Sequence, residues 1–428
     1  MQLSIYKPCL YAESSAYREF LDTKTMSKFL RHFCILFFLC HTSMVQTFSQ
    51  EAYSPIPQDS LVFENGIGGL IDRTLAVNEA KKKSTGFFKM PLLYFSPDTR
   101  LAFGGFGVYY FKLKSKREGK EPDTFEESST RLSYVKLLAD YTQNRQLDVW
   151  ASWNIFLKDE SYLGKGEFRY RIFPDRFYGI GNRSEEEDVE KFQYNLFSIK
   201  LLLLKKLQKG VFVGVDYQFA SFHNFKNEAE GQLLQNNILG ARGGNNSGFG
   251  LVFLIDTRDN VINASNGTLL EFSSYFYKDF FGSDFGYNNY NITYNQYLHL
   301  NPAKRHVLAF NTVFNFNAGG TPFMSLATVG NTDILRGYST NRFRDQNFIG
   351  TQAEYRMPLW WRFGLVGFAG VGDVFERLGD VQRDTFKYSV GGGLRFAVNK
   401  KERMNIRLDY GFGRDDNRSL YISLTEAF

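Results

Sequence analysis

The chain has 428 residues and a formal net charge of +6 at pH 7, and 17% of its residues are aromatic, including 44 Phe and 25 Tyr. This aromatic content excludes a disordered chain, and the modest, diffuse charge does not indicate a nucleic-acid partner. Outside the N-terminal region no apolar run reaches the roughly 18 residues of a membrane-spanning helix. Abundant Phe and Tyr are instead typical of a membrane β-barrel.

Residues 1–49 are predicted to be an N-terminal extension and a signal peptide. Met26 is the expected start, because Lys28 and Arg31 form a basic segment in front of the apolar core 33–39. Thr47, Phe48 and Ser49 fit the small-x-small rule for signal cleavage, so cleavage is expected after Ser49. Export of a barrel implies the outer membrane of a Gram-negative cell.

All three cysteines, Cys9, Cys34 and Cys40, lie in this N-terminal part. The rest of the chain therefore has no cysteine, which excludes a disulfide framework or a thiolate metal site there. Lipid attachment at Cys40 is the alternative for this segment, although the residues before it are larger than such a signal requires. Residues 50–85 are predicted to form a short periplasmic tail or plug.

Residues 86–428 are predicted to form the barrel, because apolar and polar residues alternate there with a period of two. The polar face carries full charges in mid-strand, such as Arg407 and Asp409, while the opposite face carries large aromatics. This direction favours lipid outside and a polar interior. The predicted fold is all-β, a 16-stranded antiparallel transmembrane β-barrel of the outer-membrane type. Strands are expected at 87–95, 101–113, 130–143, 146–157, 165–173, 190–205, 210–221, 246–256, 267–278, 287–300, 305–317, 347–358, 363–373, 386–398, 404–413 and 418–428.

An even strand count places both ends of the barrel on the periplasmic side. Short turns such as 301–304 and 399–402 are therefore expected in the periplasm. The longer connections 114–129, 222–245 and 318–346 are expected outside the cell.

Signals for catalysis are few. His32 and His41 fall in the signal peptide, and His223, His299 and His306 lack spaced partners of the kind that bind a metal. No stretch pairs a nucleophilic serine with a histidine, as an outer-membrane phospholipase would require. We therefore expect no enzyme activity, no cofactor and no metal.

The segment after residue 255 is predicted to be a strand end with a charged turn. Asp256 and Asp259 bracket Arg258, and Asn260 and Gly267 follow. An ion pair between a carboxylate and Arg258 is the favoured interpretation. A cation held by the two carboxylates is the alternative.

The loop after the strand 305–317 contains Leu335, Arg336, Gly337 and Tyr338 in sequence. An arginine between an aliphatic pair and a glycine–aromatic pair is unusual in a loop. Taken alone, it is either an ordinary solvated cation or an anchoring group.

As an ordered set, these motifs resemble the BamA/TamA superfamily of outer-membrane barrels, also called the bacterial surface antigen family. The resemblance covers about residues 86–428. Its pieces are the segments 91–97, 176–182, 256–260, 335–338, 354–359 and 367–375, and a final strand ending in Phe428 as a C-terminal strand signal.

The resemblance implies that the long loop is the sixth extracellular one and folds back into the lumen. By motif position, Arg336 would meet the acidic residues Glu354 and Asp373 on the barrel wall. An arginine suits this use, because its guanidinium stays charged and forks onto carboxylates with a fixed geometry. Gly337 would permit the tight backbone, and Tyr338 would supply a rigid packing surface.

The resemblance also implies contact with outer-membrane lipids and a role in outer-membrane protein assembly, insertion or translocation. Family members with that role carry periplasmic POTRA domains, and the predicted tail is too short for one. A separately encoded periplasmic or lipoprotein partner and client outer-membrane proteins are therefore the expected partners, and nucleic acid is not. The alternative function is a passive pore or a structural barrel.

Overall fold

A computed structural model describes residues 85–96, 100–111, 113, 133–143, 145–158, 160–301, 305–330, 333–339, 341–400, 403–424 and 426–428. All of them fall in one compact unit of the chain. The predicted signal peptide with its start at Met26, the three cysteines and the tail up to residue 84 lie outside the described residues, so these predictions stay open.

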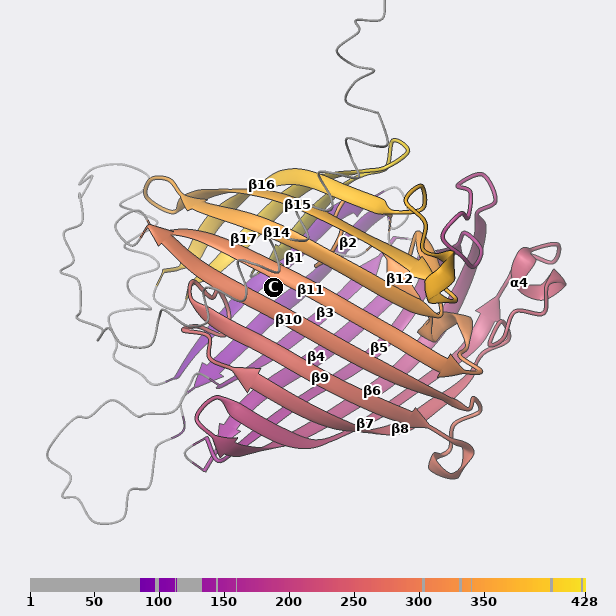
Figure 1. The fold of residues 1–428 in the computed structure, drawn as a ribbon, viewed down its shortest axis with the longest axis horizontal. Coiled ribbons are helices and arrows are strands. Elements are labelled where there is room, and N and C mark those ends of the chain that lie inside the picture. Colours follow the sequence, from indigo (N-terminus) through magenta and orange to yellow (C-terminus); the bar gives the residue numbers. More distant parts are fainter. Residues whose placement is uncertain are drawn as a thin grey trace, which may run out of the picture. The chain divides into compact units, whose positions relative to one another are not determined.

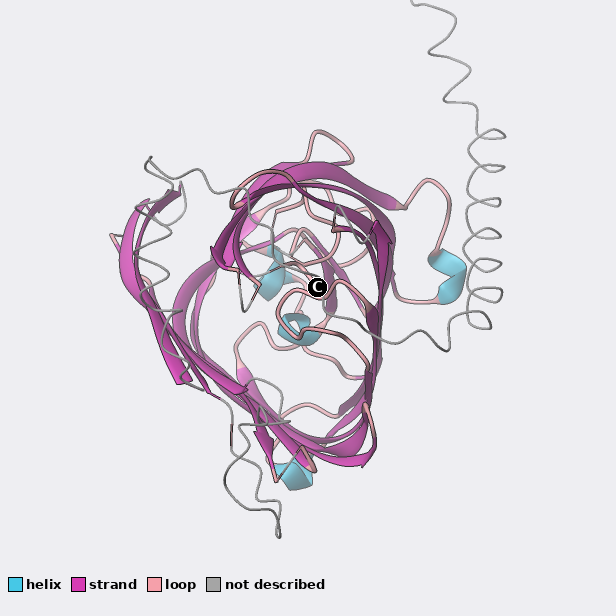
Figure 2. Cartoon of the chain, turned by 90° about the vertical axis from the view of Figure 1, so that its left-hand side faces the viewer, coloured by secondary structure: helices cyan, strands magenta, loops and turns pink. Residues whose placement is uncertain are grey.

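Sixteen long strands form one antiparallel sheet in which each strand pairs with the next along the chain. Figures 1 and 2 show them tilted and curving around an interior that contains loops. The predicted 16-stranded barrel is therefore confirmed. The strands are β1 (Thr85–Ser96), β2 (Arg100–Phe111), β3 (Ser133–Thr142), β4 (Leu147–Leu157), β5 (Tyr162–Phe177), β6 (Glu190–Gln208), β7 (Val211–Lys226), β8 (Gly244–Asp256), β9 (Gly267–Tyr277), β10 (Tyr287–Asn301), β11 (His306–Gly319), β14 (Asn347–Pro358), β15 (Phe363–Phe375), β16 (Lys387–Asn399), β17 (Met404–Gly413) and β18 (Arg418–Leu424).

The alternation of side chains gives the sheet an apolar outer face. In β7, Val213 and Val215 are exposed, whereas the side chain of the adjacent Phe212 is buried. In β18, Leu420 and Ile422 point outward in the same way. Successive side chains of a strand point to opposite faces, so this pattern sets one face toward lipid and one toward the lumen.

Helical structure is short in the described part of the chain. It consists of α4 (Gln232–Gln235), η1 (Asp279–Phe281), η2 (Phe323–Ser325) and η3 (Leu378–Asp380). None of the described helices has the length and apolar character needed to cross a membrane.

The strand order corrects one loop assignment. Antiparallel strands alternate in direction, so the connections after the second, tenth and fourteenth strands of the sheet leave at the same end. The β2–β3 connection therefore shares an end with the β10–β11 and β16–β17 turns, and placing 114–129 with the long outer loops is wrong. Residues 114–129 themselves lie outside the described residues. The β7–β8 and β11–β14 connections share the opposite end, as predicted.

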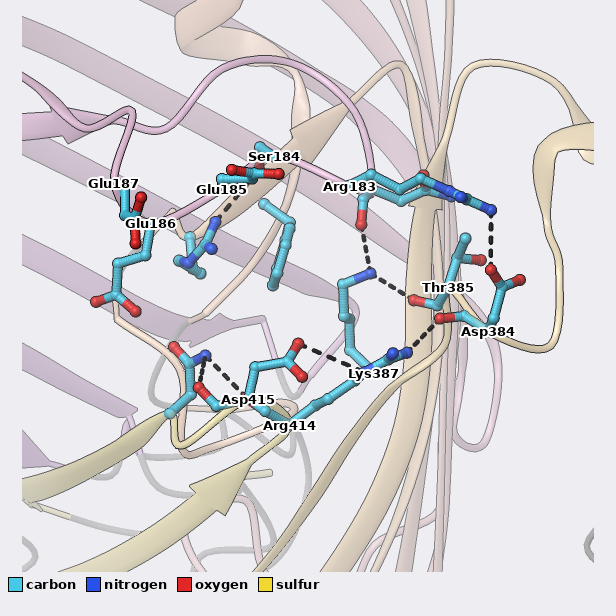
Figure 3. A pocket seen from close by; sticks show the side chains of 14 residues that line it. Arg183, Ser184, Glu185, Glu186, Glu187, Asp384, Thr385, Lys387, Arg414 and Asp415 are labelled. Atoms are coloured by element: carbon cyan, nitrogen blue, oxygen red, sulfur yellow. Dashed lines mark hydrogen bonds and ion pairs between the residues drawn. The ribbon is translucent and has the colours of Figure 1, made fainter. Parts of the chain in front are cut away.

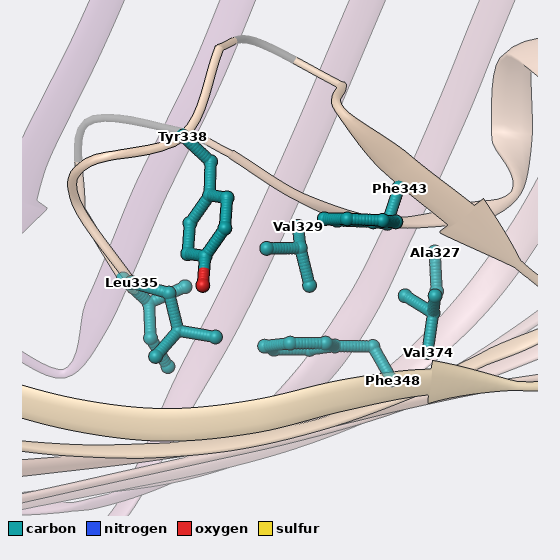
Figure 4. Packing of buried hydrophobic residues seen from close by; sticks show 8 residues of the cluster. Ala327, Val329, Leu335, Tyr338, Phe343, Phe348 and Val374 are labelled. Atoms are coloured by element: carbon teal, nitrogen blue, oxygen red, sulfur yellow. The ribbon is translucent and has the colours of Figure 1, made fainter. Parts of the chain in front are cut away.

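The connection between β11 and β14 contains its own small sheet of β12 (Ala327–Val329) and β13 (Phe343–Asp345). Apolar side chains of this loop pack against the barrel wall, and Figure 4 shows Tyr338, Leu335 and Phe343 of the loop facing Phe348 and Val374 of the wall. Burying this cluster holds the loop against β14 and β15.

Candidate functional site

The centre of the candidate site is Arg336, whose side chain is 0% exposed. Its Nη2 donates to Oε2 of Glu354 at 2.6 Å, and its Nη1 donates to a carboxylate oxygen of Asp409. The guanidinium also lies over the ring of Phe368, 3.6 Å from the ring centroid. We call Arg336, Glu354 and Asp409 the loop lock, because they join the β11–β14 loop to β14 and β17.

The structure brings only one of the two predicted acidic partners to Arg336. Glu354 was predicted to face inward by its parity in the strand, and it does so from β14. The second place belongs to Asp409 of β17 and not to Asp373, so that part of the prediction is wrong. Asp409 already stood out in the sequence as a charge in mid-strand on the polar face, and such a charge needs a partner.

The backbone next to Arg336 fits tightly against β17. Gly337 has φ +129°, and a Cβ built on it would lie 2.7 Å from the carbonyl carbon of Phe412, so a glycine is needed here. The Gly337 N–H donates to the hydroxyl of Tyr421 at 2.9 Å, and that hydroxyl donates to the carbonyl of Tyr338 at 2.9 Å. Leu335 is not a glycine, yet it has φ +53° and is fully buried. Such backbone conformations persist only where surrounding contacts hold them.

Tyr338 has the packing role that the sequence predicted. Its ring belongs to the cluster between loop and wall. Its hydroxyl donates to the carbonyl of Tyr388 at 2.7 Å and accepts a hydrogen bond from the N–H of Arg414 at 2.9 Å. The loop is therefore fastened to β16 as well as to β17.

A wider ion-pair network surrounds the loop lock. Arg356 Nε lies 2.8 Å from Oε1 of Glu354, and Arg395 bonds to Asp409 and, at 2.6 Å, to Glu426. All of these side chains are 7% exposed or less. Each buried carboxylate of the lock thus has a second arginine, which offsets the cost of burying its charge.

The C-terminus differs from the prediction. The last strand ends at Leu424 and does not continue to Phe428. Phe428 instead lies near Tyr297, with ring centroids 6.3 Å apart, and its oxygen accepts a hydrogen bond from Arg356 at 3.0 Å. A longer strand would have put Glu426 on the apolar outer face, where a charge is costly. Turning inward gives Glu426 its bond to Arg395.

Asp373 occupies a second polar cluster near the end of β15. Its carboxylate lies 3.3 Å from Lys387 Nζ and accepts hydrogen bonds from Thr385 and, at 3.3 Å, from Asn182. The parity of Asp373 in the strand matches outward-facing neighbours. It lies one residue beyond the last β15–β16 pair, at Gly372 and Lys387, and its side chain is buried. Lys387 also donates to the carbonyl of Asn182 at 2.7 Å.

This cluster borders a pocket of about 360 Å³ at the end of the barrel. Figure 3 shows Lys387 beside Thr385, with Glu186 and Glu187 among the other lining residues. The motif 176–182 takes part in holding the loop here, because the N–H of Gly181 donates to the carbonyl of Arg344 at 2.8 Å.

The charged turn after β8 forms the ion pair that the sequence favoured. Arg258 bonds to Asp256 through Nε at 2.9 Å and Nη2 at 3.2 Å. Asp259 accepts from the N–H and hydroxyl of Ser265 and from Arg403, and Asn260 accepts from two backbone N–H groups. Burial opposes ionisation of Asp259, but the hydrogen bonds from Ser265 and Arg403 outweigh it and lower its pKa.

Gly267 begins β9 with φ +104°, and a Cβ there would lie 2.4 Å from the carbonyl oxygen of Thr257. The barrel motif is therefore a tightly hydrogen-bonded turn. Its two carboxylates are engaged by protein groups, which favours the ion-pair interpretation over a cation.

A family model described as the Omp85 superfamily domain matches residues 123–428. Among solved structures, BamA from Haemophilus ducreyi lacking POTRA domains 1–3 is similar with a TM-score of 0.50 and 12% identity, over 81% of this chain and 70% of that chain. CdiB from Escherichia coli is similar with a TM-score of 0.49 and 9% identity, over 80% of this chain and 62% of that chain. The chain thus spans less than two thirds of CdiB. No curated protein sequence matches it. At these identities the solved structures indicate the fold alone.

Proposed function

Because the chain belongs to the Omp85 superfamily, we propose that it acts at the outer membrane of a Gram-negative cell in the assembly, insertion or translocation of other proteins. The observation that carries the proposal is the loop lock, in which buried Arg336 of the β11–β14 loop bonds to Glu354 and Asp409. The lock fixes this loop inside the barrel beside the last strands. It makes no contact suited to covalent chemistry, so we propose no catalytic activity.

The mechanism we propose uses a weak seam between the first and last strands, β1 and β18, which stand at the two ends of the strand order. β18 pairs with β17 over seven residues, whereas β1 pairs with β2 over twelve. A short terminal strand leaves backbone hydrogen-bonding groups of an edge without a full-length partner. Client strands could add to such an edge by backbone pairing.

Contacts of the loop converge on this seam. Asp409 lies in β17, and Tyr421, which accepts from Gly337, lies in β18. Glu426, just beyond β18, is joined to Asp409 through Arg395. The loop lock therefore supports the strands next to the seam, and loosening it should loosen the seam.

The test is depletion of the protein followed by quantitative proteomics of the outer membrane. Loss of many other barrel proteins, restored by the wild-type chain and not by Arg336→Ala, is the expected result. Arg183→Ala is the matched control, since the contacts of Arg183 with Asp384 and Gln382 are exposed. Unchanged barrel proteins with altered solute uptake would instead support the alternative, a passive pore.

Two further measurements address partners and catalysis. Affinity purification from membranes should recover a separately encoded periplasmic or lipoprotein partner, with client outer-membrane proteins. A phospholipid hydrolysis assay on the purified chain should give no turnover, and turnover would contradict the non-catalytic proposal.

A further inference from the structure

The lumen wall formed by β10 and β11 differs from the rest of the barrel interior. The inward side chains of these two strands carry no charge and include six asparagines. The register sets them opposite each other as Asn289 with Asn317, Asn291 with Asn315, and Asn295 with Asn311. We call these residues the asparagine ladder. By contrast, the inward faces of β4, β5 and β14–β17 carry ion pairs such as Arg169–Asp148 and the loop lock.

A pocket of about 330 Å³ lies against this wall, at the small end of ligand-binding cavities. Its side chains come from four strands and from the β11–β14 loop, which contributes Ser325. Three are tyrosines, Tyr275, Tyr277 and Tyr287, and the rings of the last two stack with centroids 4.4 Å apart. The amides are Gln218, Asn289, Asn291 and Asn315.

Nearly every group lining the pocket is neutral and both donates and accepts hydrogen bonds. Among the described residues that line it, none is Lys or Arg, and the one charged side chain is Glu271, 3.9 Å from Lys165. The ladder contacts, such as Asn289 to Asn315 at 3.0 Å and to Asn317 at 2.8 Å, use part of the amides' capacity, because each amide offers two hydrogens and two lone pairs.

The chemistry of the pocket selects the class of ligand. An anion would meet Glu271 without a lining cation, and an apolar molecule would leave amides and hydroxyls without partners, which is costly. A polyhydroxylated neutral molecule matches both donors and acceptors. Tyrosine ring faces carry partial negative charge, which suits the C–H groups of a sugar ring. We propose that this pocket binds a neutral saccharide of one or two rings, an activity beyond the proposed function in protein assembly.

An extended polypeptide fits the pocket less well. Polypeptides in this conformation are recognised mainly through an unpaired strand edge. The backbones of β9, β10 and β11 are paired on both sides along the pocket, so the wall offers side chains only. A peptide is therefore the rival outcome of the test.

The test uses the full chain folded in a detergent whose head group is not a sugar, such as lauryldimethylamine oxide. Maltose, cellobiose and glucose are titrated by calorimetry, with glucose 6-phosphate as the anionic probe and trialanine amide as the peptide probe. At least one disaccharide should bind, and glucose 6-phosphate should bind more weakly than glucose. Glu271→Gln should narrow that difference.

Asn291→Ala should weaken disaccharide binding by about three- to tenfold, the usual effect of losing one or two hydrogen bonds. Asn295→Ala is the matched control, because Asn295 belongs to the same ladder but does not line the pocket. A heat-dependent shift in gel mobility checks that each variant is folded. Thr293→Val, a smaller change at another lining residue, replaces Asn291→Ala if that variant does not fold.

Three results would overturn the proposal. The first is that the wild-type chain binds no disaccharide up to the solubility limit. The second is that Asn291→Ala and Asn295→Ala weaken disaccharide binding equally. The third is that trialanine amide binds and the sugars do not. Because the assay measures saccharide binding alone, its failure leaves the proteomics test of protein assembly untouched.

Discussion

Replacing Arg336 by alanine tests the loop lock directly. The substitution removes a fully buried guanidinium from two carboxylates that are also fully buried. Breaking one buried ion pair typically costs about 3–5 kcal/mol, because the partner's charge stays buried. Here Glu354 keeps Arg356 and Asp409 keeps Arg395. We therefore expect the low end of that range, a loss of about 3 kcal/mol from the free energy that holds the loop in the lumen.

That loss corresponds to about a hundredfold rise in the population of the undocked loop. Trypsin can measure it, because Arg342 and Arg344 lie in the loop and are buried when it is docked. At low protease the cleavage rate follows the open population, so Arg336→Ala should be cut at these two sites about a hundredfold faster than wild type. Arg336→Lys should fall between the two, since an ammonium cannot fork onto two carboxylates.

The matched control is Arg183→Ala. Arg183 and Asp384 form an ion pair whose side chains are 64% and 62% exposed, and exposed pairs contribute about 1 kcal/mol or less. The rate at which trypsin cleaves the loop of Arg183→Ala should therefore stay close to the wild-type rate. Equal rates for wild type and Arg336→Ala would refute the reasoning, because they would mean that the apolar cluster alone holds the loop.

Three further outcomes follow from the same structure. In double-mutant cycles with Arg336→Ala, Asp409→Asn should show a coupling energy of about 0.5–3 kcal/mol and Asp373→Asn almost none; the reverse order would restore the partner that the sequence suggested. Gly337→Ala should lower the free energy of unfolding of the barrel by about 1–3 kcal/mol, and the urea midpoint with it. The reason is that the φ of +129° and a contact at 2.7 Å strain any side chain there. Gly367→Ala, with nothing within 4 Å of the added Cβ, should leave the midpoint unchanged. Burial raises the pKa of Asp345 in the loop to about 6. The folded state then binds this proton more tightly than the unfolded chain, so loop stability should fall as pH rises from about 4 to about 6, and Asp345→Asn should remove that part of the pH dependence of trypsin cleavage.

The strands and their two faces follow from the order of residues alone. The alternation of Leu, Val and Trp with Asp and Asn in segments such as 147–157 is a local property, and it fixes which side chains meet lipid whatever the neighbouring strands are. The inward direction of Glu354 followed from the same parity. The family resemblance implied that Gly337 permits a tight backbone, and the φ of +129° gives the physical reason.

Which groups meet across the lumen depends on how the strands and the loop pack together. Asp409 is 73 positions from Arg336 in the chain. Its parity places it on the inner face, but parity alone does not say which inward charge meets Arg336. That choice depends on which strands the loop lies against. The inward turn of the C-terminus depends likewise on Arg395 being close enough to take Glu426. The polar pocket exists because the register of β10 and β11 sets their asparagines opposite each other, beside tyrosines from β9. Periodicity assigns a side chain to a face, but its neighbours on that face are set by the curvature and register of the strands.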